Sequence, residues 1–275
     1  MTLTLVSKFT VAIMANDVSE QATTALVTGA GTGIGAAITE RLAAEGRNLV
    51  LVARDSARLE DAARRLRAGH GVDVLTVPLD LSRPDSPARL AKQLTDAGIE
   101  IGVLVNNAGA AMVGAIADAD PGRLRALVDL NAAAVAELTA RFLPSMVARG
   151  HGAIVNIASS AAYAPAPYNA AYAASKAFVL SFTQALWVET QGTGVRVVAV
   201  SPGPVETPMN TRPMPGKRRP EQVAGTVMAA LRGRAPAVVD GPLSVVQTFL
   251  FSRVLPARTA TRLSGKFFAK EAGRP

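Results

Sequence analysis

The sequence predicts an α/β protein whose centre is a doubly wound parallel β-sheet with helices on both faces. Short apolar runs alternate with helical patterns from residue 23 to residue 239, and runs that are apolar at nearly every position are typical of parallel strands buried on both sides. A glycine-rich turn joins the first run to the first helical stretch. A chain of 275 residues fits one α/β domain, which can reach about 250 residues, so no second domain is required.

Six apolar runs are expected to be strands: TALVT, NLVLVA, DVLTV, IGVLV, AIVNIA and VRVVAV, which begin at residues 24, 48, 73, 101, 153 and 195. Two of the helices between them are marked by their ends. One is expected from Ser56 to Gly69, where a glycine closes it. The other is expected from Ser86 to Gly98, with Ser86 as its cap and Pro87 where a missing N–H costs nothing. This alternation predicts parallel pairing through right-handed crossovers.

The glycine-rich turn, TGAGTGIG from Thr28 to Gly35, has a strand before it and a helix after it. Glycines let the backbone approach a pyrophosphate, and the helix N-terminus offers free N–H groups and positive potential. With these flanks the turn predicts a Rossmann-type dinucleotide site, the alternative being a glycine-rich surface turn. The residues expected at the dinucleotide are Gly29, Gly31, Thr32, Gly33, Ile34 and Gly35.

The end of the second strand bears on cofactor choice. An NAD site usually has an acidic residue there, but this chain has Ala53 followed by Arg54. A guanidinium fork suits a 2′-phosphate, so NADP(H) is favoured over NAD(H). In the alternative, Arg54 is solvated and Asp55 serves the ribose. Asp80, after the third strand, is expected either at the adenine amino group or as a turn residue.

Further motifs follow the glycine turn in a fixed order: Asp80-Leu81, NNAG at 106–109, Asn131, Ser159, YAASK at 172–176 and PGPVET at 202–207. Together they resemble the short-chain dehydrogenase/reductase family in its single-domain form, over residues 23–224. The resemblance implies a Rossmann sheet of about seven strands and hydride transfer between a ketone or aldehyde and an alcohol. It also implies a small-molecule carbonyl or alcohol substrate and a homodimer or homotetramer.

The resemblance assigns catalysis to four residues. Tyr172 would be the general acid in reduction and the base in oxidation, although a free phenol has a pKa of about 10. Lys176, one helical turn on, would lower that pKa together with the oxidised nicotinamide and would hold the nicotinamide ribose. Ser159 would bond the substrate carbonyl. Asn131 would anchor a water that relays protons through Lys176, or would merely bond helix backbone. The cofactor contacts implied besides the glycine turn, Arg54 and Asp80 are Leu81, Asn107, Ala108, Gly109, Tyr172, Lys176, Pro202, Gly203, Val205 and Thr207.

The substrate side of the site is predicted to be apolar and open. The segment between Thr207 and Pro220 is short, although in this family it often forms a helical lid, so an incompletely roofed pocket is expected. The apolar character of the pocket candidates favours a lipophilic substrate. These candidates are Ala110, Met112, Ala161, Tyr168 and Met209.

The net charge of +8 is confined to the end of the chain, because residues 211–275 hold 12 Lys and Arg against 3 Asp and Glu. Within 241–275, basic and apolar residues recur at nearly helical intervals, as in helices that lie on anionic bilayers. The alternative is an arm that roofs the pocket or docks on a partner subunit. The apolar members are Val245, Val246, Phe249, Leu250, Val254, Leu263, Phe267 and Phe268, and the basic ones are Arg253, Arg258, Arg262, Lys266 and Lys270.

The chain is therefore divided into a flexible tail (1–20), a dinucleotide-binding catalytic domain (21–240) and a basic, apolar extension of that domain (241–275). The absence of cysteine excludes disulfides and fits the cytoplasm, and no apolar run is long enough for a membrane span. Two isolated histidines predict no metal site, and charge alone predicts no nucleic-acid partner. A non-catalytic NADP-binding scaffold is the alternative function, disfavoured by the four catalytic residues.

Overall fold

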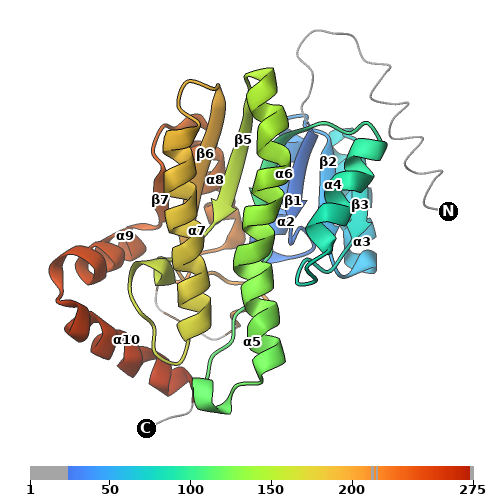
Figure 1. Cartoon of the computed structure of the whole chain (residues 1–275). Helices are drawn as coiled ribbons and strands as arrows, with labels where there is room; N and C mark the ends of the chain where they lie inside the picture. Colours follow the sequence, from blue (N-terminus) through green and yellow to red (C-terminus); the bar gives the residue numbers. More distant parts are fainter. Residues whose placement is uncertain (1–23, 212–213, 215, 273–275) are drawn as a thin grey trace.

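The computed structural model describes residues 24–211, 214 and 216–272, without the side chains of residues 267, 270 and 271. The expected tail, residues 1–20, lies outside this range. Seven parallel strands form one sheet in the order β3-β2-β1-β4-β5-β6-β7, which confirms the predicted doubly wound fold (Figure 1). The strands are β1 (Thr24–Thr28), β2 (Leu49–Ala53), β3 (Val74–Pro78), β4 (Ile101–Asn106), β5 (Gly152–Ile157), β6 (Val195–Pro202) and β7 (Ala237–Asp240).

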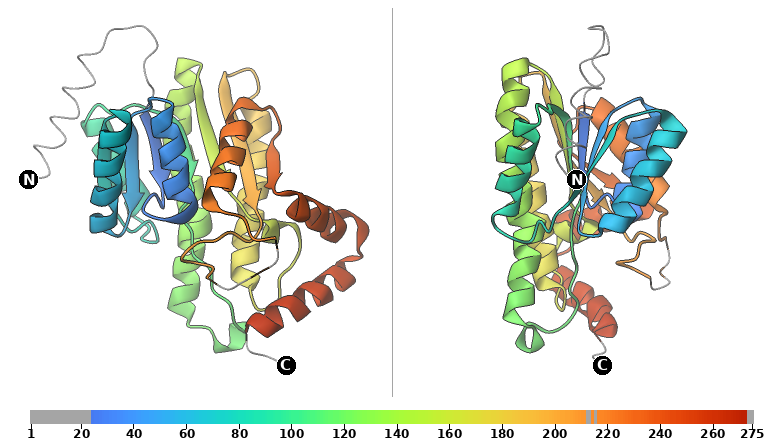
Figure 2. Two further views of the ribbon diagram at one scale, coloured as in Figure 1. Left: turned by 180° about the vertical axis from the view of Figure 1, so that it is seen from behind. Right: turned by 90° about the vertical axis from the view of Figure 1, so that its right-hand side faces the viewer.

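Helices cover both faces of the sheet, as the two layers in Figure 2 show. They are α2 (Gly33–Ala44), α3 (Ser56–His70), α4 (Ser86–Asp96), α5 (Pro121–Val128), α6 (Ala134–Arg149), α7 (Ala170–Glu189), α8 (Pro220–Arg232), α9 (Pro242–Phe249) and α10 (Ala257–Glu271). Short 3-10 turns lie at η1 (Ile116–Asp118) and η3 (Ser160–Tyr163), and single π-helical turns at η2 (Asp129–Ala133) and η4 (Leu250–Val254).

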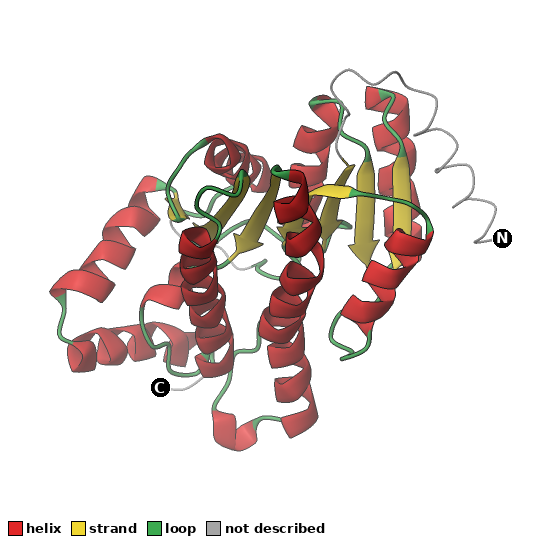
Figure 3. Ribbon diagram, turned by 45° about the horizontal axis from the view of Figure 1, so that its top comes forward, coloured by secondary structure: helices red, strands yellow, loops and turns green. Residues whose placement is uncertain are grey.

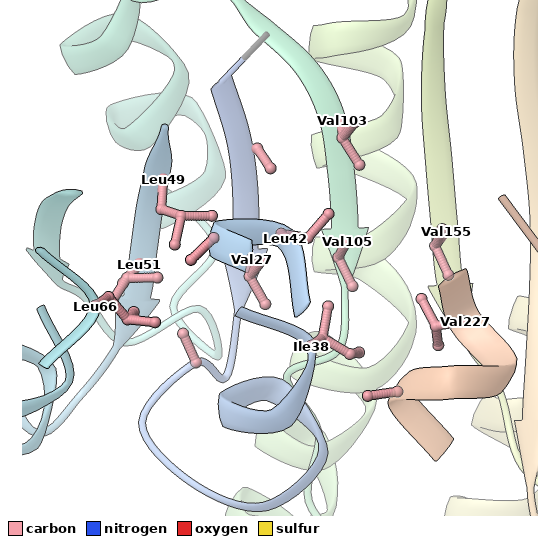
Figure 4. Packing of buried hydrophobic residues seen from close by; sticks show 14 of the residues in the cluster. Val27, Ile38, Leu42, Leu49, Leu51, Leu66, Val103, Val105, Val155 and Val227 are labelled. Carbon is pink, nitrogen blue, oxygen red and sulfur yellow. The ribbon is translucent and has the colours of Figure 1, made fainter. Parts of the chain in front are cut away.

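The two core layers follow from the apolar runs. Leu49 and Leu51 of β2 point to one face, where they pack with Ile38 and Leu42 of α2 (Figure 4). Val50, from the same strand, points to the other face and packs with the cluster of α4 and α6. A strand that is apolar at every position is thus buried on both sides, as its sequence predicts.

Two predicted helix ends are wrong in detail. Helix α3 runs past Gly69 to His70, and Gly71, with a φ of 67°, is its left-handed C-cap. Helix α4 is capped at Asp85, whereas Ser86 is its first residue, and the Ser86 hydroxyl is buried without a partner among the described residues. Helix α4 ends at Asp96, and Gly98 follows with a φ of 66°. Because N-cap preferences are similar for aspartate and serine, the sequence does not decide between these neighbours.

The C-terminal segment leaves the sheet after β7. Helices α9 and α10 extend beyond the carboxyl edge, toward the lower end of α5 in Figure 1, and both are separate from the two layers (Figure 3). We call residues 241–272 the C-terminal arm. No helix in the part of the chain that the structure describes is long and apolar enough to cross a bilayer.

Candidate active site

A cavity of about 1200 Å³ opens at the carboxyl ends of the strands. Strand order reverses between β1 and β4, and ligands of open α/β sheets bind at such a switch point. The cavity brings together nearly all the predicted site residues, from the glycine turn to Thr207. Gly35 and Asn131 do not line it.

The glycine turn is shaped so that only glycine fits at three positions. Gly29 and Gly33 have left-handed backbones, with φ of 67° and 55°. A Cβ at Gly35 would lie 2.2 Å from the Gly29 carbonyl oxygen, and one at Gly33 would lie 3.0 Å from Cγ2 of Thr207. The turn therefore presents bare backbone to the cavity at the start of α2, with Thr207 facing it. Gly35 serves the packing of the turn rather than direct contact.

Asn107 holds the glycine turn against β4. Its side-chain amide donates to the carbonyl oxygens of Thr28 at 2.9 Å and of Gly29 at 3.3 Å. The Thr28 hydroxyl in turn accepts from the backbone N–H groups of Asn107 and Ala108, both at 3.0 Å. Asn107 lines the cavity, but its amide is committed to the protein backbone.

The adenosine end of the cavity carries Arg54, Asp55 and Asp80. Asp55 caps α3 by accepting from Arg58 N at 3.0 Å and forms an ion pair with the Arg58 side chain, so its carboxylate already serves its own helix. Arg54 is exposed at the cavity wall.

Asp80 accepts from both the backbone and the hydroxyl of Ser82, at 3.0 and 2.8 Å, as a turn residue does. Burial alone would raise the pKa of the Asp80 carboxyl, but these hydrogen bonds, Arg54 and Arg83 bring it below its usual value. Asp80 is therefore a turn residue that also faces the cavity, and the Arg54 guanidinium lies close enough to stabilise its charge.

Tyr172 and Ser159 meet at the inner end of the cavity. Ser159 ends the segment after β5 and is 9% exposed, and its hydroxyl accepts from Ala161 N at 3.1 Å. Burial raises the pKa of the Tyr172 phenol, and a hydrogen bond with the Ser159 side chain opposes this without reversing it. The phenol is thus held in its protonated form with a hydroxyl beside it, an arrangement that can donate two hydrogen bonds to one oxygen.

Lys176 is buried beneath this pair. It is 5% exposed, and its Nζ donates to the carbonyl oxygen of Ile157 at 2.8 Å. Burial lowers the pKa of Lys176 to about 8. The expectation that Lys176, together with the oxidised nicotinamide, lowers the pKa of Tyr172 remains a prediction, since in this structure burial is the larger influence on the phenol.

Asn131 fixes the loop after β4 from the π-helical turn between α5 and α6. Its Oδ1 accepts from Ala110 N at 2.9 Å, and its Nδ2 donates to Ala110 O at 2.9 Å and to Ser175 Oγ at 3.1 Å. A Cβ built on Gly109 would lie 3.3 Å from Asn131 Oδ1 and 3.5 Å from Lys176 Nζ, so these three residues converge. These contacts use both N–H groups of the Asn131 amide and one lone pair of its oxygen, and the water relay predicted for this residue remains a prediction.

The residues present fit a dinucleotide. The cradle offers bare glycine backbone that a Cβ would fill, α2 begins there with free N–H groups, and Arg54 provides a cation at the far end of the same cavity. Among the described residues, no cluster of His, Asp and Glu could hold a metal ion.

The substrate side differs from its prediction. Ala110, Ala161 and Met209 line the cavity as expected, whereas Met112 and Tyr168 do not. The predicted open roof is filled by the C-terminal arm. Leu263 and Phe268 of the predicted arm line the cavity, and the lining residues that the sequence did not single out include Asn169, Gln247, Thr248, Phe251 and Ser264.

The arm docks through close glycine contacts. A Cβ on Gly203 would lie 2.1 Å from Ser244 Oγ, and one on Gly265 would lie 3.2 Å from Cγ of Pro167. Through the first contact α9 packs against the end of β6, and through the second α10 packs against the segment before α7. The alternative that residues 241–275 roof the pocket is therefore supported by the cavity lining and by these contacts.

Comparisons with known proteins agree with this geometry. The family model of the short chain dehydrogenases matches residues 23–217. An uncharacterised oxidoreductase of Staphylococcus saprophyticus is 36% identical over 211 residues, which are 76% of this chain and 90% of that protein. A solved short-chain dehydrogenase from Sphingobium yanoikuyae in complex with NADPH is 34% identical, with a TM-score of 0.76 over 86% of this chain and 97% of that one. A bulky-bulky ketone specific alcohol dehydrogenase from Comamonas testosteroni is 32% identical, with a TM-score of 0.73 over 86% and 96% of the two chains.

Proposed function

The chain belongs to the short-chain dehydrogenase/reductase family and is an oxidoreductase, and from this premise we propose that it interconverts a lipophilic ketone or aldehyde and its alcohol with NADP(H). The observation that carries the proposal is the Tyr172–Ser159 pair at the inner end of a cavity that also holds Arg54 and the glycine turn. The pair supplies proton chemistry, and the turn supplies a dinucleotide cradle.

Each residue of the site has its own role in the reduction of a carbonyl group. Bound NADPH would supply the hydride. The Tyr172 phenol, kept protonated by burial, donates its proton to the substrate oxygen, and Ser159 donates a hydrogen bond to the same oxygen as charge develops. Lys176, with a pKa of about 8, carries a positive charge at neutral pH and stabilises the phenolate that remains. In oxidation the phenolate accepts the proton from the alcohol.

The preference for NADP(H) rests on Arg54. It lies exposed in the cavity wall near Asp80, whereas the competing acidic residue, Asp55, is engaged with α3. An arginine guanidinium can donate two parallel hydrogen bonds to the oxygens of one phosphate group. The preference for a lipophilic substrate is supported by Phe251 and Leu263 in the cavity wall and by the bulky ketone specificity stated for the Comamonas testosteroni relative.

The test is NADPH consumption with a panel of aliphatic, aromatic, β-keto ester and steroid ketones, run on wild type and Tyr172→Phe. The variant should lose turnover while its NADPH affinity stays nearly unchanged, because the phenol donates a proton without holding the cofactor. Tyr168→Phe is the matched control, since Tyr168 does not line the cavity. General acid catalysis contributes about 100-fold or more, so a Tyr172→Phe enzyme that keeps over about a tenth of kcat would overturn the assignment. A wild type that binds NADPH and reduces no ketone would favour the scaffold alternative.

We also propose that the outer face of the arm makes a peripheral contact with an anionic membrane. Val246 and Phe249 are 64% and 62% exposed, and Arg253, Arg258 and Arg262, further along the same arm, are exposed cations. Apolar side chains beside cations suit the surface of an anionic bilayer. The side chains of Phe267 and Lys270, which belong to the same predicted stripe, lie outside the described residues.

Co-sedimentation with phosphatidylglycerol liposomes tests this contact at low and high salt, with a Val246→Ser/Phe249→Ser double variant as the comparison. Wild type should pellet at low salt, and the double variant should stay in the supernatant. Wild type that stays in solution while folded and active would refute the membrane role. If the double variant instead changes the oligomeric state in gel filtration, the face is a contact between copies of the chain.

A further inference from the structure

Asn169 is a buried polar side chain in the wall of the cavity. The residue is 6% exposed and lines the cavity together with Tyr172. Its Oδ1 atom is buried and has no hydrogen-bond partner among the described residues. Because buried side-chain oxygens are nearly always paired in folded proteins, an unpaired one at the edge of a ligand cavity points to a partner that the ligand brings.

The helix does not use this side chain. Asn169 is the N-cap of α7, and asparagine at that position usually accepts a hydrogen bond from the first turn of the helix. Here the backbone of Asn169 has φ −138° and ψ 31°, and its side chain makes no cap bond. The carbonyl oxygen of Asn169 accepts from Ala173 N at 3.0 Å, and its N–H donates to Ala166 O at 3.0 Å. The backbone thus starts the helix, and the carboxamide is left for another purpose.

The chain is strained next to this residue. Among the residues that the structure describes, Tyr168 is the one non-glycine residue with a left-handed backbone, at φ 64°. A bulky residue rarely adopts this conformation, and such strain gathers at functional sites. The backbone N–H of Gly114 donates to the Tyr168 carbonyl oxygen at 2.7 Å, which ties the strained residue to the loop after β4. The strain sets the direction in which the next residue, Asn169, leaves the backbone.

The arm packs on the same segment. Gly265 of α10 lies against Pro167, where a Cβ would come within 3.2 Å of the proline ring. Asn169 is thus two residues from a contact with the arm, and Tyr172 follows it by one helical turn. Residues three apart on a helix have Cβ atoms about 5–6 Å apart, so a group bound to Asn169 is close to the reacting carbonyl.

We propose that Asn169 is a substrate-positioning residue whose carboxamide oxygen accepts a hydrogen bond from a hydroxyl group that the substrate carries near its reacting carbonyl. Rotation about the Cβ–Cγ bond, whose torsion is broad, presents Oδ1 to the cavity. The substrate class is then a lipophilic hydroxyketone, or a diol in the oxidation direction. This inference rests on the proposed carbonyl reduction and deepens it.

The test compares matched ketones in which one group is changed. Phenacyl alcohol, its methyl ether and propiophenone form one set, and β-hydroxypropiophenone, its methyl ether and butyrophenone form a second set with longer spacing. Wild type with NADPH should prefer the alcohol over the ether in kcat/KM in at least one set, by about tenfold, the factor expected for one hydrogen bond. Asn169→Leu should abolish this preference, and Asn169→Gln, which keeps the amide, should retain more of it than Asn169→Leu does.

A structural role predicts a different result. If Asn169 only holds α7, Asn169→Leu should lower Tm and reduce kcat/KM for the alcohol and the ether alike. Ser86→Ala is the matched control, because the buried Ser86 hydroxyl also has no partner in the described part of the chain but does not line the cavity, and it should leave the alcohol-to-ether ratio unchanged.

Two results would overturn the inference and leave carbonyl reduction standing: a wild type that reduces ether and alcohol equally well in both sets, or an Asn169→Leu enzyme that keeps the preference. If no ketone turns over, the proposed reduction fails instead. Thermal shifts of the NADP⁺-bound protein with phenacyl alcohol and its ether then decide the role of Asn169, since a larger shift for the alcohol that Asn169→Leu removes supports it and equal shifts refute it.

Discussion

Lys176 should destabilise the folded protein at neutral pH, although the proposed reaction needs it. Its pKa falls from 10.5 to about 8 on folding because burial penalises the charge. A difference of this size corresponds to roughly 3 kcal/mol of folding free energy. The hydrogen bond to the Ile157 carbonyl oxygen offsets part of it, by roughly 1.5–3 kcal/mol for a charged donor. Lys176→Met, which removes both terms, should therefore leave the free energy of unfolding at pH 7 unchanged or raise it by up to about 2 kcal/mol.

The pH dependence separates the two terms. Between about pH 8 and pH 10.5 the unfolded chain keeps a proton on Lys176 that the folded protein has released, so the free energy of unfolding of wild type rises with pH through this window. Lys176→Met lacks this rise. The difference in unfolding free energy between wild type and variant should therefore shift by roughly 3 kcal/mol in favour of wild type from neutral pH to about pH 10.5.

Urea denaturation at pH 7, 8, 9 and 10 measures this difference. Lys92→Met is the control, because Lys92 is exposed and paired with Asp96 on the surface, and its curve should run parallel to that of wild type. A gap between wild type and Lys176→Met that changes by less than about 1 kcal/mol over this range would refute the assignment of a buried, destabilised ammonium. Turnover and NADPH affinity of Lys176→Met should both fall, so stability and activity would move in opposite directions.

Three further predictions concern the cofactor cradle and the fold. Arg54→Ala should weaken NADPH binding by about 10- to 150-fold, the loss of a charged hydrogen bond, with little change for NADH; equal losses in fluorescence titration would mean that the arginine is structural. Gly35→Ala should lower the free energy of unfolding by at least about 1–3 kcal/mol, because its Cβ would lie 2.2 Å from the Gly29 carbonyl oxygen; an unchanged Tm would contradict the close packing of the turn. Arg218→Met should cost about 3–5 kcal/mol, since Asp240 is fully buried and accepts from the Arg218 guanidinium at 2.9 and 3.0 Å. The Thr226 hydroxyl also donates to Asp240, and urea denaturation that shows a loss of less than about 1 kcal/mol would mean that Thr226 alone satisfies the carboxylate.

The sequence predicts the sheet and the cofactor cradle because both depend on local pattern. Strands apolar at every position can be satisfied only between two layers of helices, and the glycines of the turn occupy backbone positions that other residues cannot. The proposed catalytic residues meet for a simple reason. Ser159 comes just after the end of β5, and Tyr172 and Lys176 lie one turn apart on α7, so that all three line the cavity. Their spacing along the chain is therefore enough to predict that these side chains lie together.

The hydrogen-bond partners of individual polar side chains could not be predicted in the same way. Nothing in the pattern around Asn131 shows that its amide bonds to Ala110 and Ser175, because those partners come from distant segments. The unpaired oxygen of Asn169 follows a left-handed backbone at Tyr168. This conformation is rare for a tyrosine, so the sequence does not predict it.

The division of the arm into an inner and an outer face was also beyond the sequence. The π-helical turn from Leu250 to Val254 and the extended residue Leu255 interrupt the helical period between α9 and α10. A single periodicity drawn through the arm therefore mixes side chains that line the cavity, such as Phe251, with strongly exposed ones such as Val246 and Phe249. The predicted stripe fitted both a membrane contact and a roof of the pocket because its residues belong to two helices, α9 and α10.

The roof of the cavity lies outside the segment that the family model matches. That match ends at residue 217, whereas Gln247, Phe251 and Leu263 of the arm complete the cavity wall. Part of the substrate-facing wall thus comes from a stretch of the chain outside the one that holds the proton-transfer pair and the glycine turn. Changes confined to the last two helices can therefore reshape this part of the cavity wall while the proton-transfer pair and the glycine turn stay intact.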